Sequence, residues 1–246
     1  MAEGVDSANV VGYTTANVPQ NTFYMLGLQY EKVGGGAMSV QEVKGTFNGV
    51  DYDDNYEFLQ TAPNLQVWTP SGYDLYYYLN DAWSVGDVYS AGWADNWGVL
   101  ADGTITPGQG AWFKDPNEVC TVTTPGQVVA TAASVSAAKD IFTMGSVPYP
   151  ASFEVNGVTW TGIQGVDYDD NYEFLQTAPN LQVWTPSGYD LYYYLNDAWS
   201  VGDVYSAGWA DNWGVLATGS FPVGYGFWLK PTTAVTVGFT SPLSAN

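Results

Sequence analysis

The sequence contains no histidine and no arginine, and its only basic residues are five lysines against 25 acidic residues. A nucleic-acid-binding protein needs basic side chains that displace counterions from phosphates, so a formal net charge of −20 excludes DNA and RNA as partners. Anionic membrane surfaces are excluded for the same electrostatic reason. Without histidine the chain also lacks the commonest neutral-pH acid or base and the commonest transition-metal ligand. Any site must therefore use carboxylates, amides, hydroxyls and aromatic rings.

Cysteine and long apolar segments are also scarce. Cys120 is the only cysteine, so it forms no internal disulfide, and we expect it to be a strand residue, with an intermolecular bridge as the alternative. No run of about 18 apolar residues occurs, which excludes insertion into a membrane. The first residues show no charged and apolar export segment. However, few lysines and many tyrosine, tryptophan, asparagine, glycine and threonine residues are typical of exported proteins. We therefore expect a secreted or cell-surface protein.

One stretch of the sequence occurs twice without a substitution, because residues 49–101 recur as residues 165–217. A repeat of this length indicates two tandem domains, since the repeats of solenoid proteins are much shorter. We place the two β-rich domains at residues 1–126 and 127–246.

The segments that flank the identical stretch are similar but not identical. Upstream, residues 10–27 align with residues 128–145 at an offset of 118, which makes Phe23 equivalent to Ile141. Downstream, the similarity continues to the lysine that follows a Trp-Phe pair in one repeat and a Trp-Leu pair in the other. The repeat unit is therefore larger than its identical part.

The sequence pattern inside each repeat is that of β-strands. Residues 65–68 and 73–79 are separated by Thr-Pro-Ser-Gly, which predicts a strand, a turn and a strand. Alternation along the second strand predicts a core face formed by Tyr73, Leu75, Tyr77 and Leu79. The opposite face is expected to be half-exposed and is formed by Asp74, Tyr76, Tyr78 and Asn80.

Further short strands are expected near residues 22–28, 110–113, 119–122 and 234–239, where branched and aromatic residues are bounded by Gly, Pro, Asn and Asp. Only residues 54–60 favour a short helix. The predicted fold class is therefore all-β, with two tandem homologous β-sandwich or β-barrel-like domains.

Short motifs in the first repeat occur in a recognisable order. They are Val-Gly-Tyr at 11–13, then Val-Trp, Gly-Tyr and Tyr-Tyr-Tyr between 67 and 78, and Pro-Gly-Gln-Gly-Ala-Trp-Phe at 107–113. In this order they resemble secreted, β-rich repeat proteins of planctomycete and verrucomicrobial bacteria, whose function is uncharacterised. The second repeat departs from the pattern, with Ala130 and Thr131 in place of Gly12 and Tyr13. The resemblance implies export and β structure, and it implies no activity.

Aromatic side chains are concentrated in the identical stretch, interleaved with carboxylates and amides. Flat rings stack on sugar rings, while carboxylates and amides accept hydrogen bonds from sugar hydroxyls, so this composition favours binding of a glycan or another cell-envelope component. The alternative is that such rings fill the cores of small β domains, and we expect about half of them to do so. Tyr89 and Tyr205 belong to the same aromatic runs. The candidate ligand-binding residues are Trp68, Tyr76, Tyr78, Asp81, Trp83, Trp93, Asp95 and Trp97, repeated as Trp184, Tyr192, Tyr194, Asp197, Trp199, Trp209, Asp211 and Trp213.

Oxygen-bearing side chains alternate near the start of each identical stretch. Oxygen ligands at alternate positions of a curved loop predict a Ca²⁺ site, because this ion accepts six to eight of them. The pattern departs from the helix-loop-helix calcium loop, since Tyr56 stands where the sharp turn requires glycine. The alternative is a solvated acidic edge that discourages strand pairing. The candidate metal ligands are Asp51, Asp53, Asn55 and Glu57, repeated as Asp167, Asp169, Asn171 and Glu173.

Candidate catalytic groups are few. Asp81, Asp87 and Asp95 lie among the aromatic residues and offer the carboxylates that a glycoside hydrolase needs. No nucleophile has a histidine partner, and no phosphate-binding glycine loop is present. The sequence therefore predicts a non-enzymatic extracellular protein with two copies of an aromatic and acidic surface. The structural alternative is a self-assembling subunit of a surface layer, matrix or filament, which associates through exposed sheet edges.

Overall fold

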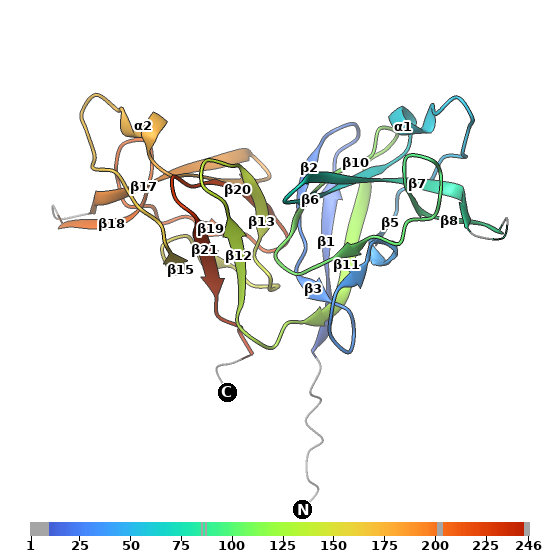
Figure 1. The fold of residues 1–246 in the computed structure, drawn as a ribbon, viewed down its shortest axis with the longest axis horizontal. Helices are drawn as coiled ribbons and strands as arrows, with labels where there is room; N and C mark the ends of the chain where they lie inside the picture. The colour runs from blue at the N-terminus through green and yellow to red at the C-terminus, as the bar shows by residue number, and fades with distance from the viewer. Residues whose placement is uncertain (1–9, 85, 87, 201–203, 244–246) are drawn as a thin grey trace, which may run out of the picture.

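The computed structural model describes residues 10–84, 86, 88–200 and 204–243. Figure 1 shows an all-β molecule in which two similar halves lie side by side. The first half contains strands β1 to β11 and helix α1, and the second contains strands β12 to β21 and helix α2. The all-β fold class predicted from the sequence is confirmed. Among the described residues, no helix has the length and apolar content needed to cross a membrane.

The first half is built from two layers of strands. Its five-stranded antiparallel sheet has the order β2-β10-β6-β7-β8, and β1, β11, β3 and β5 form the layer that faces it. Its main core is formed by residues such as Val122 of β11 and by Leu65 and Phe113 of β6 and β10. A strand pair, β4 with β9, and a short 3-10 turn, η1, close one side of this core. The elements are β1 Val11–Val18, β2 Tyr24–Gly27, β3 Tyr30–Glu31, β4 Met38–Ser39, η1 Val40–Glu42, β5 Lys44–Gly45, α1 Phe58–Thr61, β6 Asn64–Thr69, β7 Gly72–Ser84, β8 Val88–Ala94, β9 Thr104–Ile105, β10 Gly110–Lys114 and β11 Cys120–Val128.

The second half repeats this plan with a smaller facing layer. Its five-stranded sheet has the order β13-β20-β16-β17-β18, and β12, β21 and β15 face it. Leu181 and Phe227 of the large sheet and Val237 of β21 belong to one core. The elements are β12 Ala133–Ala137, β13 Thr143–Ser146, β14 Phe153–Glu154, β15 Thr159–Thr161, α2 Phe174–Thr177, β16 Asn180–Thr185, β17 Gly188–Ser200, β18 Val204–Ala210, β19 Ser220–Phe221, β20 Gly226–Lys230 and β21 Val235–Phe239.

Strand β7 is buried on both faces along part of its length. On one face, Tyr76 packs with Leu65 in the main core. On the other face, Leu79 packs against Phe58 at the start of α1. The predicted core face was therefore wrong in part, since Tyr76 is buried and Leu75 is 43% exposed. Alternation along one strand does not reveal that a helix covers the second face of the sheet.

The structure also revises the alignment of the flanking segments. The Lys114 ammonium lies over the ring of Phe23 at 5.2 Å from its centroid, and the equivalent Lys230 lies over Phe142 at 5.4 Å. Phe142 is therefore the counterpart of Phe23, and the prediction that Ile141 holds this position was wrong by one residue. The second half has accommodated the extra residue between β12 and β13.

The end of the first half lies slightly beyond the position expected from the sequence. Strand β11 continues through residue 126 to Val128, whose amide N–H donates to the carbonyl of Val10 at 2.8 Å. Cys120 lies at the start of this strand, as predicted, and the structure shows that it is buried. The chain passes to the second half only in residues 129–132.

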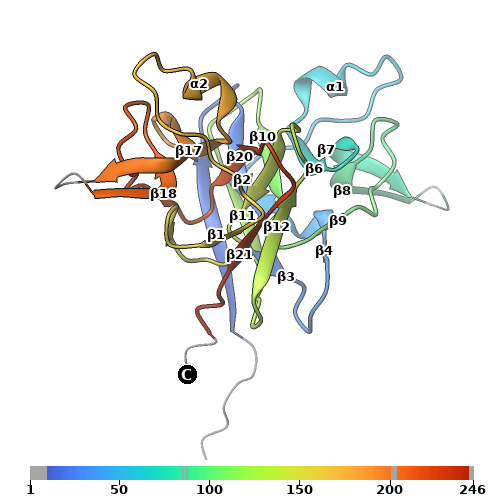
Figure 2. The same cartoon turned by 60° about the vertical axis from the view of Figure 1, so that its left-hand side comes forward.

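The two halves meet near the middle of the molecule (Figure 2), where matched backbone hydrogen bonds join them. The amide N–H of Gly27 donates to the carbonyl of Gly224, and that of Ser146 donates to Gly108, each at 2.8 Å. The Ser146 hydroxyl also donates to the carbonyl of Gln109 at 2.8 Å. These contacts place the inner edges of both five-stranded sheets together, and β8 and β18 lie at opposite ends of the molecule (Figure 1).

Aromatic contacts between the halves follow the same approximate two-fold relation. Trp68 packs edge-on against Trp228, with 5.4 Å between ring centroids. Its counterpart Trp184 packs edge-on against Trp112 at 5.8 Å. Each half thus inserts the tryptophan that precedes its Thr-Pro-Ser-Gly turn against the other half, which fixes their relative position.

Candidate functional site

The predicted ligand-binding aromatics lie in three different environments. Trp93 and Trp209 are fully buried, and Tyr76 and Tyr192 are at most 9% exposed. All four belong to the main cores, and Tyr78 and Tyr194 pack against the same cores from partly buried positions. Half of the predicted rings are therefore core residues, as expected from the sequence, and they do not form a surface.

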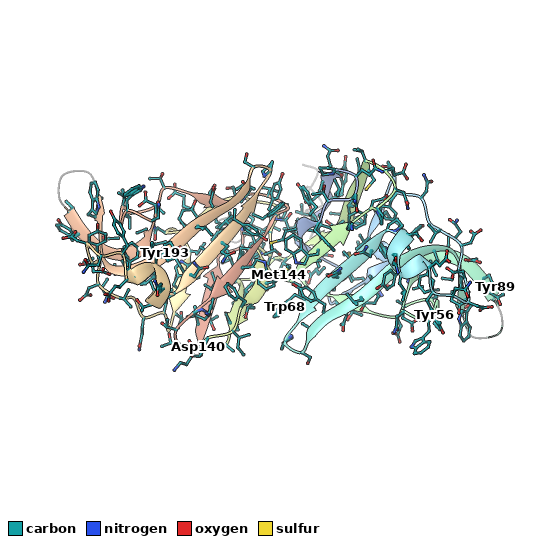
Figure 3. All side chains as sticks on the ribbon, turned by 90° about the horizontal axis from the view of Figure 1, so that it is seen from above. Tyr56, Trp68, Tyr89, Asp140, Met144 and Tyr193 are labelled. Carbon is teal, nitrogen blue, oxygen red and sulfur yellow. The ribbon has the colours of Figure 1, made fainter. Side chains whose placement is uncertain are left out.

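A second group is exposed at the two ends of the molecule. Trp83 and Trp97 are 38% and 60% exposed, and Trp199 and Trp213 are 37% and 60% exposed. Two tyrosines per half complete each group, and Figure 3 shows Tyr56 and Tyr89 at the same end of the molecule. We call each group a distal aromatic patch; the patches comprise Tyr56, Trp83, Tyr89 and Trp97 in the first half and Tyr172, Trp199, Tyr205 and Trp213 in the second.

A two-stranded ribbon carries the first part of each patch. Trp83 of β7 lies opposite Tyr89 of β8 in the antiparallel pairing, so both rings lie on one face of the ribbon. Residues 88–91 are all exposed, because the ends of β7 and β8 extend beyond the layer that covers the rest of the sheet (Figure 1). Trp83 and Tyr89 are themselves exposed, so these aromatic rings remain available to a ligand.

The loop after β8 carries the second part of the patch. The Asp95 carboxylate accepts the amide N–H groups of Trp97 at 2.8 Å and Val99 at 3.0 Å, which fixes a tight turn. Gly98 has a φ of +78°, and a Cβ at this position would collide with Tyr52. Glycine is therefore required for the loop to close over the acidic loop that precedes α1.

Contacts between these segments make the patch continuous. The amide N–H of Trp83 donates to the carbonyl of Gly98 at 3.0 Å, which places the ribbon beside the Trp97 loop. The ring of Tyr56 meets that of Trp97 edge-on, with 5.9 Å between centroids. In the second half the corresponding distance, between Tyr172 and Trp213, is 6.0 Å. The same arrangement thus occurs at both ends of the molecule.

The predicted carboxylates hold the patch in shape. The Asp81 carboxylate accepts the amide N–H of Tyr52 at 2.7 Å, and Asp197 does the same for Tyr168. The pKa of Tyr52 is raised by desolvation and by the nearby Tyr56 and Asp54, so its hydroxyl stays neutral. Polar groups that remain exposed beside the rings come from Asp54 and Asn96 and from their counterparts in the second half.

The acidic loop forms a helix cap. The Asp53 carboxylate accepts three backbone N–H groups, from Asn55, Glu57 and Phe58, at 2.9 to 3.0 Å. The Asp51 carboxylate accepts the side-chain amide of Asn80 at 3.0 Å. Asp167 and Asp169 make the same contacts in the second half, where Asn171 and Glu173 are exposed. In the part of the chain that the structure describes, no group of three acidic or cysteine side chains is arranged to hold a metal ion. The Ca²⁺ site stays a prediction.

The outer edge of each large sheet is capped over part of its length. The Gln41 side-chain amide donates to the carbonyl of Trp93 at 2.6 Å and accepts its N–H at 3.0 Å. Asn156 makes the same two bonds to Trp209, at 3.0 and 2.8 Å. These amides occupy the place of a further strand. The exposed first half of β8, and likewise of β18, lies beyond this cap.

Trp68 and Trp184 form the third environment, at the contact between the halves. Each lines a groove whose other wall comes from the opposite half, joined in the groove at Trp184 by Tyr225 of the same half. The groove at Trp184 has a volume of about 590 Å³, and the groove at Trp68 has a volume of about 480 Å³. Figure 3 shows Trp68 near the middle of the molecule, far from Tyr56 and Tyr89. These two tryptophans are therefore separate from the distal aromatic patches.

Tyr56 and Tyr172 were not predicted as ligand-binding residues. Both adopt positive φ values, 60° and 61°, in the acidic loops. The sequence signal was the presence of a tyrosine where a sharp turn ordinarily uses glycine, since the turn then presents a ring to solvent.

No protein-family model, no curated protein and no solved structure matches the chain. The resemblance to secreted repeat proteins of planctomycete and verrucomicrobial bacteria stays a prediction. The functional assignment therefore depends on the chemistry of the surfaces described above.

Proposed function

We propose that the protein is a non-enzymatic, extracellular or cell-surface glycan-binding protein that uses its two distal aromatic patches. The observation that supports this function is the exposure of the same four aromatic side chains at both ends of one molecule. Large exposed aromatic groups mark binding sites, since a soluble protein otherwise buries them. Rings flanked by carboxylates and amides suit the apolar faces and hydroxyl groups of sugars.

The charge of the protein narrows the class of glycan. With 25 acidic and five basic residues, the surface repels sulfated or uronic-acid polymers. We therefore infer neutral polysaccharides as ligands. Because β8 and β18, which carry part of the two patches, lie at opposite ends of the molecule (Figure 1), a long polymer can engage both patches, which raises its apparent affinity above that of a short fragment.

Isothermal titration with neutral and anionic polysaccharides tests this function. Two double variants, Trp83→Ala with Trp97→Ala and Trp199→Ala with Trp213→Ala, each remove one patch without touching the main cores. Each should remove one of the two patch sites for short fragments and weaken polymer binding on the order of tenfold. The matched control is Tyr13→Ala, which removes an aromatic ring that is 70% exposed on β1. No binding of any neutral polysaccharide, or equal effects of the control, would refute the function.

A second candidate function, self-assembly, is favoured by the uncapped part of each sheet edge. Exposed sheet edges ordinarily avoid pairing because they carry charged residues or proline. Residues 88–91 of β8 carry neither. The identical edge of β18 lies at the other end of the molecule, so edge-to-edge pairing between copies propagates into a filament. Electron microscopy of the wild type beside a variant with Ser90→Lys and Ser206→Lys tests this function. Filaments that the lysines abolish support it, and monodisperse wild-type particles refute it.

A further inference from the structure

Each of the two grooves between the halves has one wall formed by the same repeated sequence. In each, that wall is the turn Trp-Thr-Pro-Ser-Gly that joins two strands of the large sheet, at Trp184 in one groove and at Trp68 in the other. Because this turn belongs to the identical stretch, any difference between the grooves comes from the flanking segments.

The opposite walls differ in chemistry. The groove at Trp184 is lined by Asn17, Thr22, Tyr24 and Tyr225, and we call it the tyrosine groove. The groove at Trp68 is lined by Ala137, Ile141, Thr143 and Val235, and we call it the aliphatic groove. The tyrosine groove thus combines aromatic rings with hydroxyl and amide groups, whereas the aliphatic groove offers little hydrogen bonding beyond threonine and serine hydroxyls.

The aromatic wall of the tyrosine groove is formed by both halves. The ring of Tyr24 meets that of Trp184 edge-on at 6.3 Å and lies 5.6 Å from that of Tyr225. Burial, followed by the hydrogen bond to Tyr225, raises the pKa of Tyr24. Its hydroxyl is therefore neutral at physiological pH and retains its hydrogen. The rings are held by packing between the halves, so the groove is formed before any ligand arrives.

No charged side chain lines the tyrosine groove among the described residues, although the chain carries 25 acidic residues. A volume of about 590 Å³ lies within the usual size range of small-ligand sites. A neutral ligand with an apolar ring face and several hydroxyl groups matches this lining, because the rings stack on the face while the hydroxyl and amide groups bond to the edge.

We propose that the tyrosine groove is a second, separate binding site that takes one neutral pyranose sugar unit, and that the aliphatic groove does not bind it. The site is single in each chain, whereas the distal aromatic patch is present twice. It shares no residue with those patches, so the two proposals succeed or fail independently.

The matched pair Trp184→Leu and Trp68→Leu tests the site, because both residues occupy the same turn and both contact the other half. The probes are neutral mono- to tetrasaccharides of glucose, galactose, mannose and N-acetylglucosamine, titrated calorimetrically and by saturation-transfer NMR. In a background with Trp83, Trp97, Trp199 and Trp213 changed to alanine, which removes both distal aromatic patches, we expect one site per chain, a loss of affinity on the order of tenfold in Trp184→Leu, and no change in Trp68→Leu. Tyr225→Phe and Asn17→Ala keep the packing between the halves and should each weaken binding severalfold. They test the site even if Trp184→Leu loosens the contact between the halves.

A variant with Trp83, Trp97, Trp199 and Trp213 all changed to alanine separates this site from the distal aromatic patches. It should lose polysaccharide binding and retain the single short-sugar site. The proposal is overturned if none of the probes binds this variant, if Trp68→Leu weakens binding as much as Trp184→Leu, or if Tyr225→Phe and Asn17→Ala both leave the affinity unchanged.

Discussion

Trp93 and Trp209 occupy identical positions in the repeat, yet their indole N–H groups have different environments. Both side chains are fully buried. The Nε1 of Trp93 donates to the carbonyl of Val43 at 2.9 Å, whereas that of Trp209 has no hydrogen-bond partner among the described residues. In the second half, the ring of Trp160 packs 4.8 Å from Trp209. We therefore expect Trp93→Phe to destabilise the protein more than Trp209→Phe.

The size of the difference follows from the hydrogen bond alone, because both changes remove the same atoms from a buried site. Trp93→Phe leaves the buried carbonyl of Val43 without its partner, which costs about 1–3 kcal/mol. Trp209→Phe removes an N–H that is already buried without a partner. The desolvation cost of that N–H, comparable to the cost at the Val43 carbonyl, then disappears and offsets part of the packing loss. The free energies of unfolding of the two variants should therefore differ by at least about 2 kcal/mol.

Urea denaturation followed by circular dichroism measures these free energies. Hydrogen exchange of residues 14–28 and 133–147 then reports which half has been loosened, because peptides from the identical stretch do not distinguish the halves. Trp97→Phe and Trp213→Phe are matched controls at positions that are both 60% exposed, and their effects should agree to within about 0.5 kcal/mol. If Trp209→Phe is as destabilising as Trp93→Phe, burial of the unpaired N–H of Trp209 carries no cost, and the expected difference is refuted.

Three further predictions concern the buried Cys120 thiol, the buried Asp115 carboxylate and the side-chain amides that cap the sheet edges. Burial raises the pKa of the Cys120 thiol to about 12, so a thiol reagent should label Cys120 only as the protein unfolds, and rapid labelling of the native protein would contradict this. Burial also raises the pKa of Asp115; the stability gained by its protonation is present below its ordinary pKa and is lost as pH rises through the raised one. Asp115→Asn should therefore reduce the decline in the free energy of unfolding between these two pH values, as measured by urea denaturation. Gln41→Ala and Asn156→Ala should each cost about 1–3 kcal/mol in the same assay, and no loss in either would show that the amide does not support the sheet edge.

The strands could be predicted from the sequence because alternation and turn residues are local signals. Residues 64–69 and 72–84 form a hairpin, β6 and β7, around Pro70 and Ser71, close to the predicted positions. The absence of an internal disulfide at Cys120 followed from the absence of a second cysteine, whereas its burial did not follow from the sequence.

The exposure of individual tryptophans could not be predicted from the sequence. Trp83 and Trp93 both lie in strands with similar sequence patterns. They differ in exposure because the ribbon around Trp83 extends beyond the facing layer, whereas Trp93 lies between the two layers. That distinction depends on where the second layer ends, which non-local packing decides. The role of Asp53 as a helix cap was missed for a similar reason, since its three donors become adjacent only when the loop closes.

The identical stretches also have a consequence for how the chain reaches this structure. Strands β6, β7 and β8 have the same sequence as β16, β17 and β18, so during folding either set fits the hydrogen-bonding partners of the other. Only non-identical neighbours, such as Phe47 against Trp93 and Trp160 against Trp209, distinguish the correct docking. Exchange of these hairpins between two chains would satisfy every contact within the hairpins themselves. Concentrated refolding therefore favours domain-swapped dimers, and the flanking segments, where the two copies differ, are the part of the chain that disfavours them.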